Sequence, residues 1–327
     1  MAGYLLRRVA SAAAVVLVTL LVSFVLFFIA PKDPVGAVCG AKCPPERAAE
    51  IAASLHLDDP VMQQFGQYVK GIFVGQTISS GGTTVECGPP CLGYSYKLGQ
   101  PVTTLLADAA PVTFSIVLGA AVVYLLVGVC NGIVAARRRG TTLDRVTVAG
   151  TLVLSSIPYF VVALILALYV AGRVLPPSGW TSPLDSPLAW FNGLLAAWVT
   201  LGLVNAAAYT RYSRASMIEA LGEDFVRTAR SKGISERRVV YRHGLRAALG
   251  PVTTIFGIDL AAQLTGAFFT ERIFGLPGLG TLTLNAFAQN DMPVIMGSVL
   301  VGAILLVTLN LLVDLMYTVL DPRVRLG

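Results

Sequence analysis

Four of the five cysteines stand in two closely spaced pairs, a pattern that suits either disulfide or metal chemistry. The pairs are Cys39 with Cys43 and Cys87 with Cys91, within a polar stretch of about residues 31–110. Thiols on an oxidising side of a membrane form disulfides, and four cysteines allow three pairings. Two C-x3-C halves would also suit zinc. We expect two disulfides, because charge counts given below place this stretch outside the cytoplasm.

Polar side chains within apolar stretches are a second group of candidates. Asp259 follows Pro251 by eight residues, roughly 12 Å along a helix, which places it near the middle of a bilayer core. A carboxylate at that depth costs about 2.5–3.5 kcal/mol, so we expect it to face water, pair with a donor or be protonated. Gln263, one turn later, projects on the same side. The pair either lines a passage or ties helices together. Asp314, nearer the chain end, is expected to be structural.

Several kinds of chemistry are not expected. The sequence contains no G-x-x-x-x-G-K-[ST] motif, so we expect no nucleotide site in this chain. Its two histidines, His56 and His243, lie outside the apolar stretches, which argues against an intramembrane hydrolase with a serine or zinc centre. Cys130 lies in an apolar stretch and is expected to be a small buried hydrophobe. Pro158 interrupts another such stretch and is expected to kink it beside a passage.

The composition is that of a membrane protein. Hydrophobic residues make up 55% of the chain and charged residues 13%, with a mean hydropathy of +0.73, whereas soluble domains carry about 25% charged residues. A membrane crossing needs roughly 20 apolar residues. Six stretches reach that length, so the sequence predicts an all-α protein with six transmembrane helices, at about 9–30, 112–135, 146–172, 191–210, 252–270 and 294–319.

The basic residues predict the orientation of these helices. Seventeen of the 24 Lys and Arg residues fall on the face that carries both termini and seven on the other. Basic residues are enriched on the cytoplasmic side, so we expect both termini in the cytoplasm and residues 31–110 outside, as a cap of two helices. The net charge of +6 then reflects topology and gives no indication of nucleic acid binding.

The segment at 226–251 places seven basic side chains between two apolar stretches. Leu221, Phe225 and Ala229 recur every four residues, which predicts a short amphipathic helix. Gly233 suits the left-handed position after a helix, and Ser235 suits the N-cap of the next helix. We therefore expect a helix–turn–helix hairpin over 219–247. It either docks a partner protein or serves as a basic loop that fixes topology and contacts anionic lipid.

This hairpin resembles the cytoplasmic coupling loop, or EAA loop, of binding-protein-dependent ABC transporter permeases, in the form found in the first permease subunit of the dipeptide/oligopeptide family. Arg227-Thr228-Ala229 matches the E-A-A positions and Gly233 the glycine that follows, although the first two positions differ and Gly250-Pro251 replaces the usual Leu-Pro. Five further segments resemble the family in order: YLLRR at 4–8, GYSY at 93–96, SSIPYF at 155–160, FGLPGLG at 274–280 and NLLVDLMYTVLDPR at 310–323.

The resemblance implies the ABC importer permease fold with an extracytoplasmic insertion between the first two helices. The expected organisation is an N-terminal transmembrane helix at 1–30, the extracytoplasmic segment at 31–110 and a five-helix core at 111–327 that includes the coupling loop at 211–250. Small residues and the glycine of such a loop dock on an ATP-hydrolysing subunit. The residues implied for this contact are Arg227, Thr228, Ala229, Arg230, Lys232 and Gly233.

The implied function is that of a permease subunit in an ATP-driven importer of dipeptides or oligopeptides, with haem and nickel as open alternatives. It implies a second homologous permease, two partner ATPases that bind ATP and Mg, an external solute-binding protein, and a plasma-membrane location; the chain itself is expected to hold no cofactor and to be no enzyme. Asp259, Gln263 and Pro158 are the expected lining of the translocation path. The rival reading is a proton-coupled secondary transporter that uses Asp259 and Asp314, although no internal repeat supports it.

Overall fold

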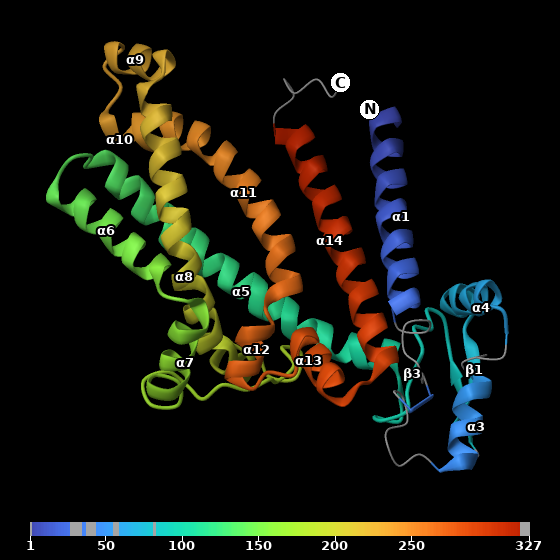
Figure 1. Ribbon diagram of the computed structural model, residues 1–327. Helices are drawn as coiled ribbons and strands as arrows, with labels where there is room; N and C mark the ends of the chain where they lie inside the picture. The colour runs from blue at the N-terminus through green and yellow to red at the C-terminus, as the bar shows by residue number, and fades with distance from the viewer. Residues whose placement is uncertain (1, 27–34, 37–43, 55–58, 81–82, 321–327) are drawn as a thin grey trace. The chain divides into compact units, whose positions relative to one another are not determined.

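The computed structural model describes residues 2–26, 35–36, 44–54, 59–80 and 83–320. These residues form two compact units. One contains the described residues up to Thr113 together with Pro277–Leu311, and the other contains Phe114–Leu276. The long helix α5 (Val102–Arg137) contributes residues to both. Helices dominate each unit (Figure 1).

The first unit combines long apolar helices with a small mixed segment. Its helices are α1 (Ala2–Phe24), α3 (Pro45–Ser54), α4 (Val61–Val74), α13 (Leu279–Gln289) and most of α14 (Met292–Leu320). The helices expected in the outer segment are therefore present as α3 and α4. Two antiparallel strand pairs were not expected: β1 (Gln76–Ser80) with β2 (Thr83–Cys87), and β3 (Tyr94–Ser95) with β4 (Gln100–Pro101).

The core of the first unit lies where α14 meets the start of α5. A Cβ atom on Gly297 would come within 2.5 Å of Val102 Cγ1, so the two helices touch at this point. Asp291, just before α14, is buried and accepts a hydrogen bond from the Ser95 hydroxyl. Burial raises the pKa of Asp291, although hydrogen bonds from Ser95 and the Val294 N–H act in the opposite direction. This contact ties the β3 segment to the beginning of α14.

The second unit is a helical bundle built around α8 (Pro187–Gly222). The helices α6 (Thr142–Ser156) and α7 (Tyr159–Tyr169) pack against it, as does α11 (Leu245–Gly266). Three short elements, α9 (Asp224–Ser231), α10 (Glu236–Arg238) and the π-helix η2 (Val239–Gly244), connect α8 to α11. The helix α12 (Phe268–Phe274) follows α11 and packs on α7.

Glycines let α5 approach α8 closely. A Cβ atom on Gly128 would lie 2.5 Å from Tyr209 Cβ, and one on Gly132 would lie 2.8 Å from the Thr210 carbonyl oxygen. Trp198 of α8 donates a hydrogen bond of 2.8 Å to the Ser115 carbonyl. Small residues allow backbones to come together where lipid offers no hydrophobic drive for association. The α5–α8 contact is therefore a backbone-to-backbone seam.

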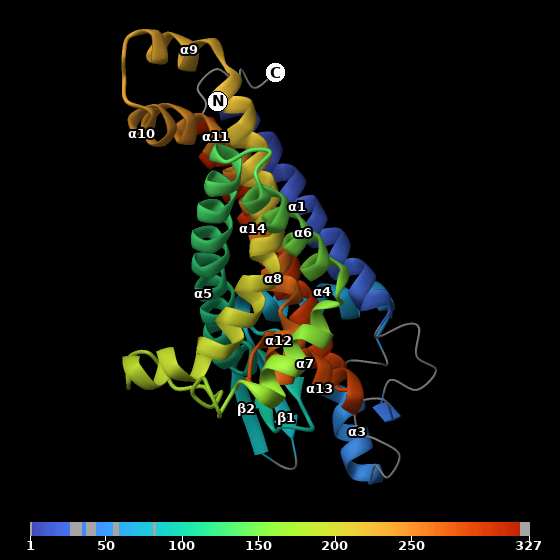
Figure 2. The same ribbon diagram turned by 90° about the vertical axis from the view of Figure 1, so that its left-hand side faces the viewer.

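Five helices of the described chain are long and apolar enough to cross a membrane, or up to six if the bent pair α6–α7 is one span. This agrees with the expected six crossings. Pro158 does interrupt the third stretch, but as a break rather than a kink: α6 ends at Ser156, α7 begins at Tyr159, and the two differ in direction by 93°. The view in Figure 2 shows α6 and α7 beside α8.

Candidate functional site

The hairpin between α8 and α11 is built on a small apolar core. Val226 and Ala229 of α9 are buried and pack with Val239 of η2 and with the partly buried Ile234. Phe225, expected on the buried face, is instead 45% exposed. The structure thus has the expected helix–turn–helix, with Val226 in place of Phe225 on its inner face.

Gly233 closes the turn in the conformation that the sequence predicts. Its φ is +70°, in the left-handed region that glycine adopts without steric cost. The N–H of Gly233 donates to the Arg230 carbonyl at 2.9 Å, and the N–H of Ile234 donates to the Ala229 carbonyl at 3.3 Å. This pair of bonds, with the Ala229–Ile234 apolar contact, is a Schellman motif. It ends α9 firmly and turns the chain towards α10.

An ion pair joins the two arms of the hairpin. Arg230 donates to both carboxylate oxygens of Glu236, at 2.8 and 3.1 Å, and this contact raises the pKa of Arg230. Arg227 pairs with Asp224 at 3.3 Å within α9. Ser235, expected to cap the second helix, makes no capping hydrogen bond through its hydroxyl. The ion pair and the glycine turn thus add to the small apolar core that holds the two arms together.

The outer surface of the hairpin is polar and basic. Among the residues matched to the coupling loop, Arg227, Thr228, Arg230 and Lys232 are exposed, whereas Ala229 belongs to the small core. A Cβ atom on Gly233 would meet nothing within 4 Å, so the turn itself is open to a partner. Beside it lies an open hollow of about 560 Å³, lined by Ser235, Arg237, Arg238, Tyr241 and Arg242.

A polar cluster lies inside the apolar part of the bundle, where α5, α8 and α11 come together. The Tyr209 hydroxyl donates a hydrogen bond of 3.0 Å to Asp259 Oδ2. Tyr124, which is fully buried, lies close to Tyr209, Asp259 and Gln263, and its ring is 4.6 Å from that of Tyr209. Asp259 and Gln263 are thus gathered around one tyrosine hydroxyl.

The two tyrosines of this cluster were missed by the sequence reasoning. Both interrupt otherwise aliphatic or small-residue runs, in VVYLL at 122–126 and AAAYT at 206–210. A tyrosine hydroxyl within an apolar helix normally has a polar partner. The sequence therefore indicated that these tyrosines and Asp259 need polar partners. It did not indicate that α5, α8 and α11 bring them together.

Pro158 is not part of the polar cluster. It precedes α7, whose first residue, Tyr159, makes a hydrogen bond of 2.6 Å through its hydroxyl to Thr270 of α12. Asp314 lies in α14, and its side chain lies outside the described part of the structure. Of the three residues expected in the translocation path, Asp259 and Gln263 come together and Pro158 stands apart.

A bidentate ion pair fastens α6 to α8. Arg214 donates to Asp144 through Nε at 2.6 Å and through Nη2 at 2.9 Å, and the Gly140 N–H also donates to this carboxylate at 2.9 Å. One turn earlier, Arg211 donates to the Thr151 carbonyl at 3.2 Å. The sequence counts had treated these arginines only as markers of topology.

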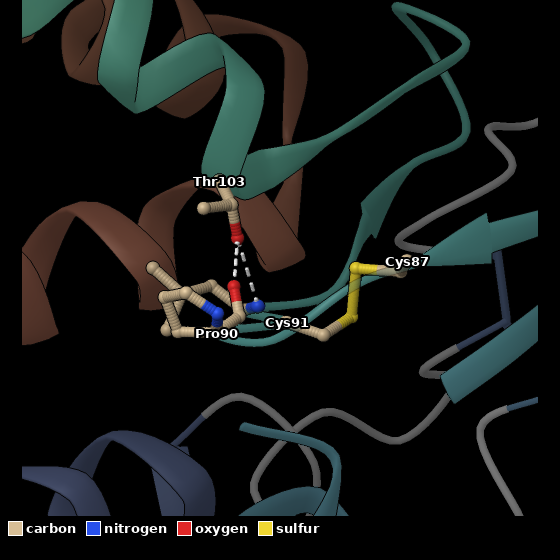
Figure 3. Close-up of a disulfide and its surroundings, with 5 residues drawn as sticks. Cys87, Pro90, Cys91 and Thr103 are labelled. Atoms are coloured by element: carbon tan, nitrogen blue, oxygen red, sulfur yellow. Dashed lines mark hydrogen bonds between the residues drawn. A yellow bond between two sulfur atoms is a disulfide. The ribbon is translucent and has the colours of Figure 1, made fainter. Parts of the chain in front are cut away.

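The cysteines give a partial answer to the disulfide prediction. Cys87 and Cys91 form a disulfide, with an S–S distance of 2.06 Å, at the end of β2 (Figure 3). The Thr103 hydroxyl donates to the Pro90 carbonyl at 2.5 Å and accepts from the Leu92 N–H at 3.2 Å, which holds this loop against the start of α5. Cys39 and Cys43 lie outside the described residues. Cys130, expected to be buried, is exposed.

A bundle of membrane-length helices that carries a basic hairpin defines a multi-pass membrane protein. Comparison of the sequence with known protein families identifies the kind of membrane protein. Residues 128–326 match the family described as binding-protein-dependent transport system inner membrane component, and residues 1–117 match the N-terminal model of the same systems. The chain therefore belongs to this family, and is a multi-pass permease subunit of the ABC importer class with an all-α fold.

Individual relatives match over nearly their whole length. A putative peptide transport system permease protein of Brucella abortus (strain 2308) is 35% identical, with 99% of both chains covered. The dipeptide transport system permease proteins DppB of Bacillus subtilis (strain 168) and Escherichia coli (strain K12) are 34% and 33% identical, with at least 99% of every chain covered. These findings confirm the resemblance predicted from the sequence, and they give no support to the proton-coupled alternative.

Proposed function

We propose that this chain is one of two permease subunits in an ATP-driven importer of dipeptides or oligopeptides. The relatives with this level of identity are named as peptide or dipeptide permeases. The structural observation that carries the proposal is the exposed, glycine-closed hairpin at 219–247. It projects from α8 and continues through α10 and η2 into α11 without a break.

Under this proposal the energy enters through contact with partner subunits. Two ATP-binding subunits, which hold ATP and Mg, dock beneath the permease pair, and a solute-binding protein delivers the peptide from outside. The chain carries no cofactor of its own. The distribution of 17 basic residues against seven supports a plasma-membrane orientation with both termini and the hairpin in the cytoplasm and residues 31–110 outside.

The hairpin residues divide into a contact surface and a support. The exposed side chains of Arg227, Thr228, Arg230 and Lys232 and the open backbone at Gly233 meet the ATPase, because they lie on the solvent side of α9 and its turn, opposite the small apolar core. Ala229 packs beneath them and keeps α9 close to the second arm. A basic surface of this kind favours an acidic partner.

The helix bundle supplies the path. Asp259 and Gln263 line it, and the break at Pro158 lets α7 change direction relative to α6. Because α10, η2 and α11 follow one another directly, movement of the hairpin is passed to the helix that carries Asp259. ATP-driven closure of the partner subunits would in this way exchange an outward-open cavity for an inward-open one.

Replacing Gly233 with valine tests the docking role. The left-handed φ of +70° is unfavourable for a β-branched residue, and the added side chain covers the turn. We expect at least a tenfold loss of ATP-dependent peptide uptake in proteoliposomes containing the full transporter, with normal membrane insertion. Gly140→Val is the matched control, since Gly140 also has a left-handed φ (+81°) with no neighbour within 4 Å but lies between α5 and α6. Wild-type uptake by Gly233→Val would contradict the docking role.

Cysteine labelling tests the placement of the outer segment. With a membrane-impermeant maleimide on intact cells, Cys87 and Cys91 should resist labelling until a reductant is added, because their thiols are joined. Cys39 and Cys43 are predicted from the sequence to behave in the same way. Labelling of Cys87 and Cys91 without reductant would remove the disulfide, and labelling only after permeabilisation and reduction would reverse the proposed orientation.

A further inference from the structure

The polar cluster of α5, α8 and α11 has unused hydrogen-bonding capacity. The Tyr209 hydroxyl donates a hydrogen bond to Asp259 Oδ2, while Asp259 Oδ1 has no hydrogen-bond partner among the described residues. The Tyr124 hydroxyl lies within reach of the Tyr209 hydroxyl and the Gln263 amide, yet this hydroxyl and both amide atoms of Gln263 are buried and make no hydrogen bond of normal geometry within the described chain. A buried polar group left unpaired costs about 1–3 kcal/mol, and more in a membrane. Three such groups at one place indicate a site that a component outside this chain completes.

The chemistry of the cluster favours a singly charged cation. Asp259 is a carboxylate, and no lysine, arginine or histidine of the described chain forms an ion pair with it. A divalent metal would require more acidic or imidazole ligands, and the described residues contain no group of three or more His, Cys, Asp or Glu side chains placed to hold one. One carboxylate with neutral oxygens is instead suited to an ion of single charge.

The acceptors match the donors of a primary ammonium group. Such a group carries three N–H donors, and the cluster offers Asp259 Oδ1, the Tyr124 hydroxyl oxygen and Gln263 Oε1 as acceptors. Two further aromatic rings pack beside Tyr124: the centroid of Tyr209 lies 4.6 Å and that of Phe256 6.2 Å from the Tyr124 centroid. Aromatic faces attract cations, most strongly where water is excluded.

The site has one open side. Asp259 is partly exposed, whereas Tyr124 and the amide atoms of Gln263 are buried behind it. The carboxylate is therefore the group that a solute in the passage meets first. The close approach of α5 and α8 at Gly128 keeps Tyr209 fixed, and Tyr209 in turn holds the carboxylate in place.

We propose that Asp259, Tyr124 and Gln263 bind the α-ammonium group of the peptide in transit, with Tyr209 as a positioning residue for the carboxylate. This inference rests on the proposed function, because it takes the transported solute to be a peptide with a free amino end. It assigns the permease itself a selective contact with the cationic end of its substrate.

The test compares alanyl-alanine with N-acetyl-alanyl-alanine, which lacks the ammonium group. The purified complex of both permeases and both ATPases, without the solute-binding protein, is titrated with each compound and followed by thermal shift. We expect the wild type to be stabilised by alanyl-alanine alone. Asp259→Asn should weaken that binding at least tenfold, and Asp259→Glu should retain part of it. Asp185→Asn, which removes an exposed carboxylate outside the helices, is the control and should bind as the wild type does.

Tyr209→Phe separates a binding site from a simple tie between helices. If Asp259 only joins α8 to α11, Asp259→Asn and Tyr209→Phe will lower the melting temperature equally and leave the difference between the two compounds unchanged, which would overturn the inference. Equal stabilisation of the wild type by both compounds would overturn it as well. ATP-driven uptake by wild-type proteoliposomes is measured separately: its absence would refute the proposed function, while the ammonium site is judged by the thermal shift alone.

Discussion

In the hairpin, Arg230 pairs with Glu236 across a turn, and both side chains remain about half exposed. In the bundle, Arg214 reaches across to a different helix, where the Asp144 side chain is only 5% exposed and also accepts a backbone N–H. Hairpin charges keep their contact with water, so they are free to be used on a partner. The charges of the bundle pair with each other between helices, as Arg214 of α8 does with Asp144 of α6. The same residue types therefore stay solvated in one region and tie helices together in the other, which agrees with the proposed docking role of the hairpin.

The largest effect is expected at the close approach of α5 and α8. Gly128→Ala would place a Cβ atom 2.5 Å from Tyr209 Cβ and 3.1 Å from the Ala206 carbonyl, atoms that cannot move without separating α5 from α8. We expect a loss of about 3 kcal/mol in the free energy of unfolding, measured by denaturant titration of the purified protein in detergent. Gly150→Ala in α6 is the control: with nothing within 4 Å, it should stabilise the protein by up to about 1 kcal/mol. An equal change in the free energy of unfolding for Gly128→Ala and Gly150→Ala would contradict the close contact between α5 and α8.

An intermediate effect is expected from Arg214→Met, which keeps the length of the side chain and removes its charge. Asp144 then loses its bidentate partner on α8. An exposed ion pair contributes little, whereas removal of one partner of a buried pair leaves a charge uncompensated, so this variant should lower the free energy of unfolding clearly more than the loss of an exposed pair does. Arg227→Met removes a fully solvated pair within α9 and should change stability by less than about 0.5 kcal/mol. If both variants lose the same amount, the contrast between bundle and hairpin is wrong.

Apart from the control variants, Arg230→Ala is expected to change stability least. Its partner Glu236 remains solvated when left alone, so the loss should be about 0.5 kcal/mol. Under the proposed docking role, the same variant should nevertheless reduce ATP-dependent uptake several-fold, because it removes a basic contact for the ATPase. Stability is measured as for the other variants, and uptake in proteoliposomes. If Arg230→Ala strongly lowers the free energy of unfolding but leaves uptake normal, this hairpin charge stabilises the fold and does not contact the ATPase, which would contradict the comparison between hairpin and bundle.

The sequence predicted what depends on neighbouring residues. The turn at Gly233 follows from a local steric requirement, and the apolar stretches follow from the thickness of a bilayer. Phe225 was wrongly expected on the buried face, because the four-residue spacing that starts at Leu221 was continued into α9. The backbone is extended at Glu223 (ψ 151°), which ends α8 and starts α9 in a new phase. The sequence pattern contains no marker of that phase change.

Contacts between distant segments could not be predicted in the same way. Asp144 and Arg214 are 70 residues apart, and Tyr209 and Asp259 are 50 residues apart. Hydropathy places Cys130 in a membrane helix but does not tell which side of that helix faces a neighbour, and its side chain is exposed. Likewise Pro158 predicts an interruption, whereas the direction of α7 is set together with the Tyr159–Thr270 contact.

The elements α10, η2 and α11 follow one another without a break, so they connect the hairpin directly to the helix bundle. Arg238 and Asp259 are 21 residues apart on this run, roughly 30 Å at the rise of a helix. The wide turns of η2 are its weakest section, since π-helical hydrogen bonds are rarely sustained. Under the proposed docking role, a movement of the hairpin would act first on η2, whose turns would convert into ordinary α-helix. Such a conversion would rotate α11 about its own axis, and Asp259 with it, relative to the hairpin.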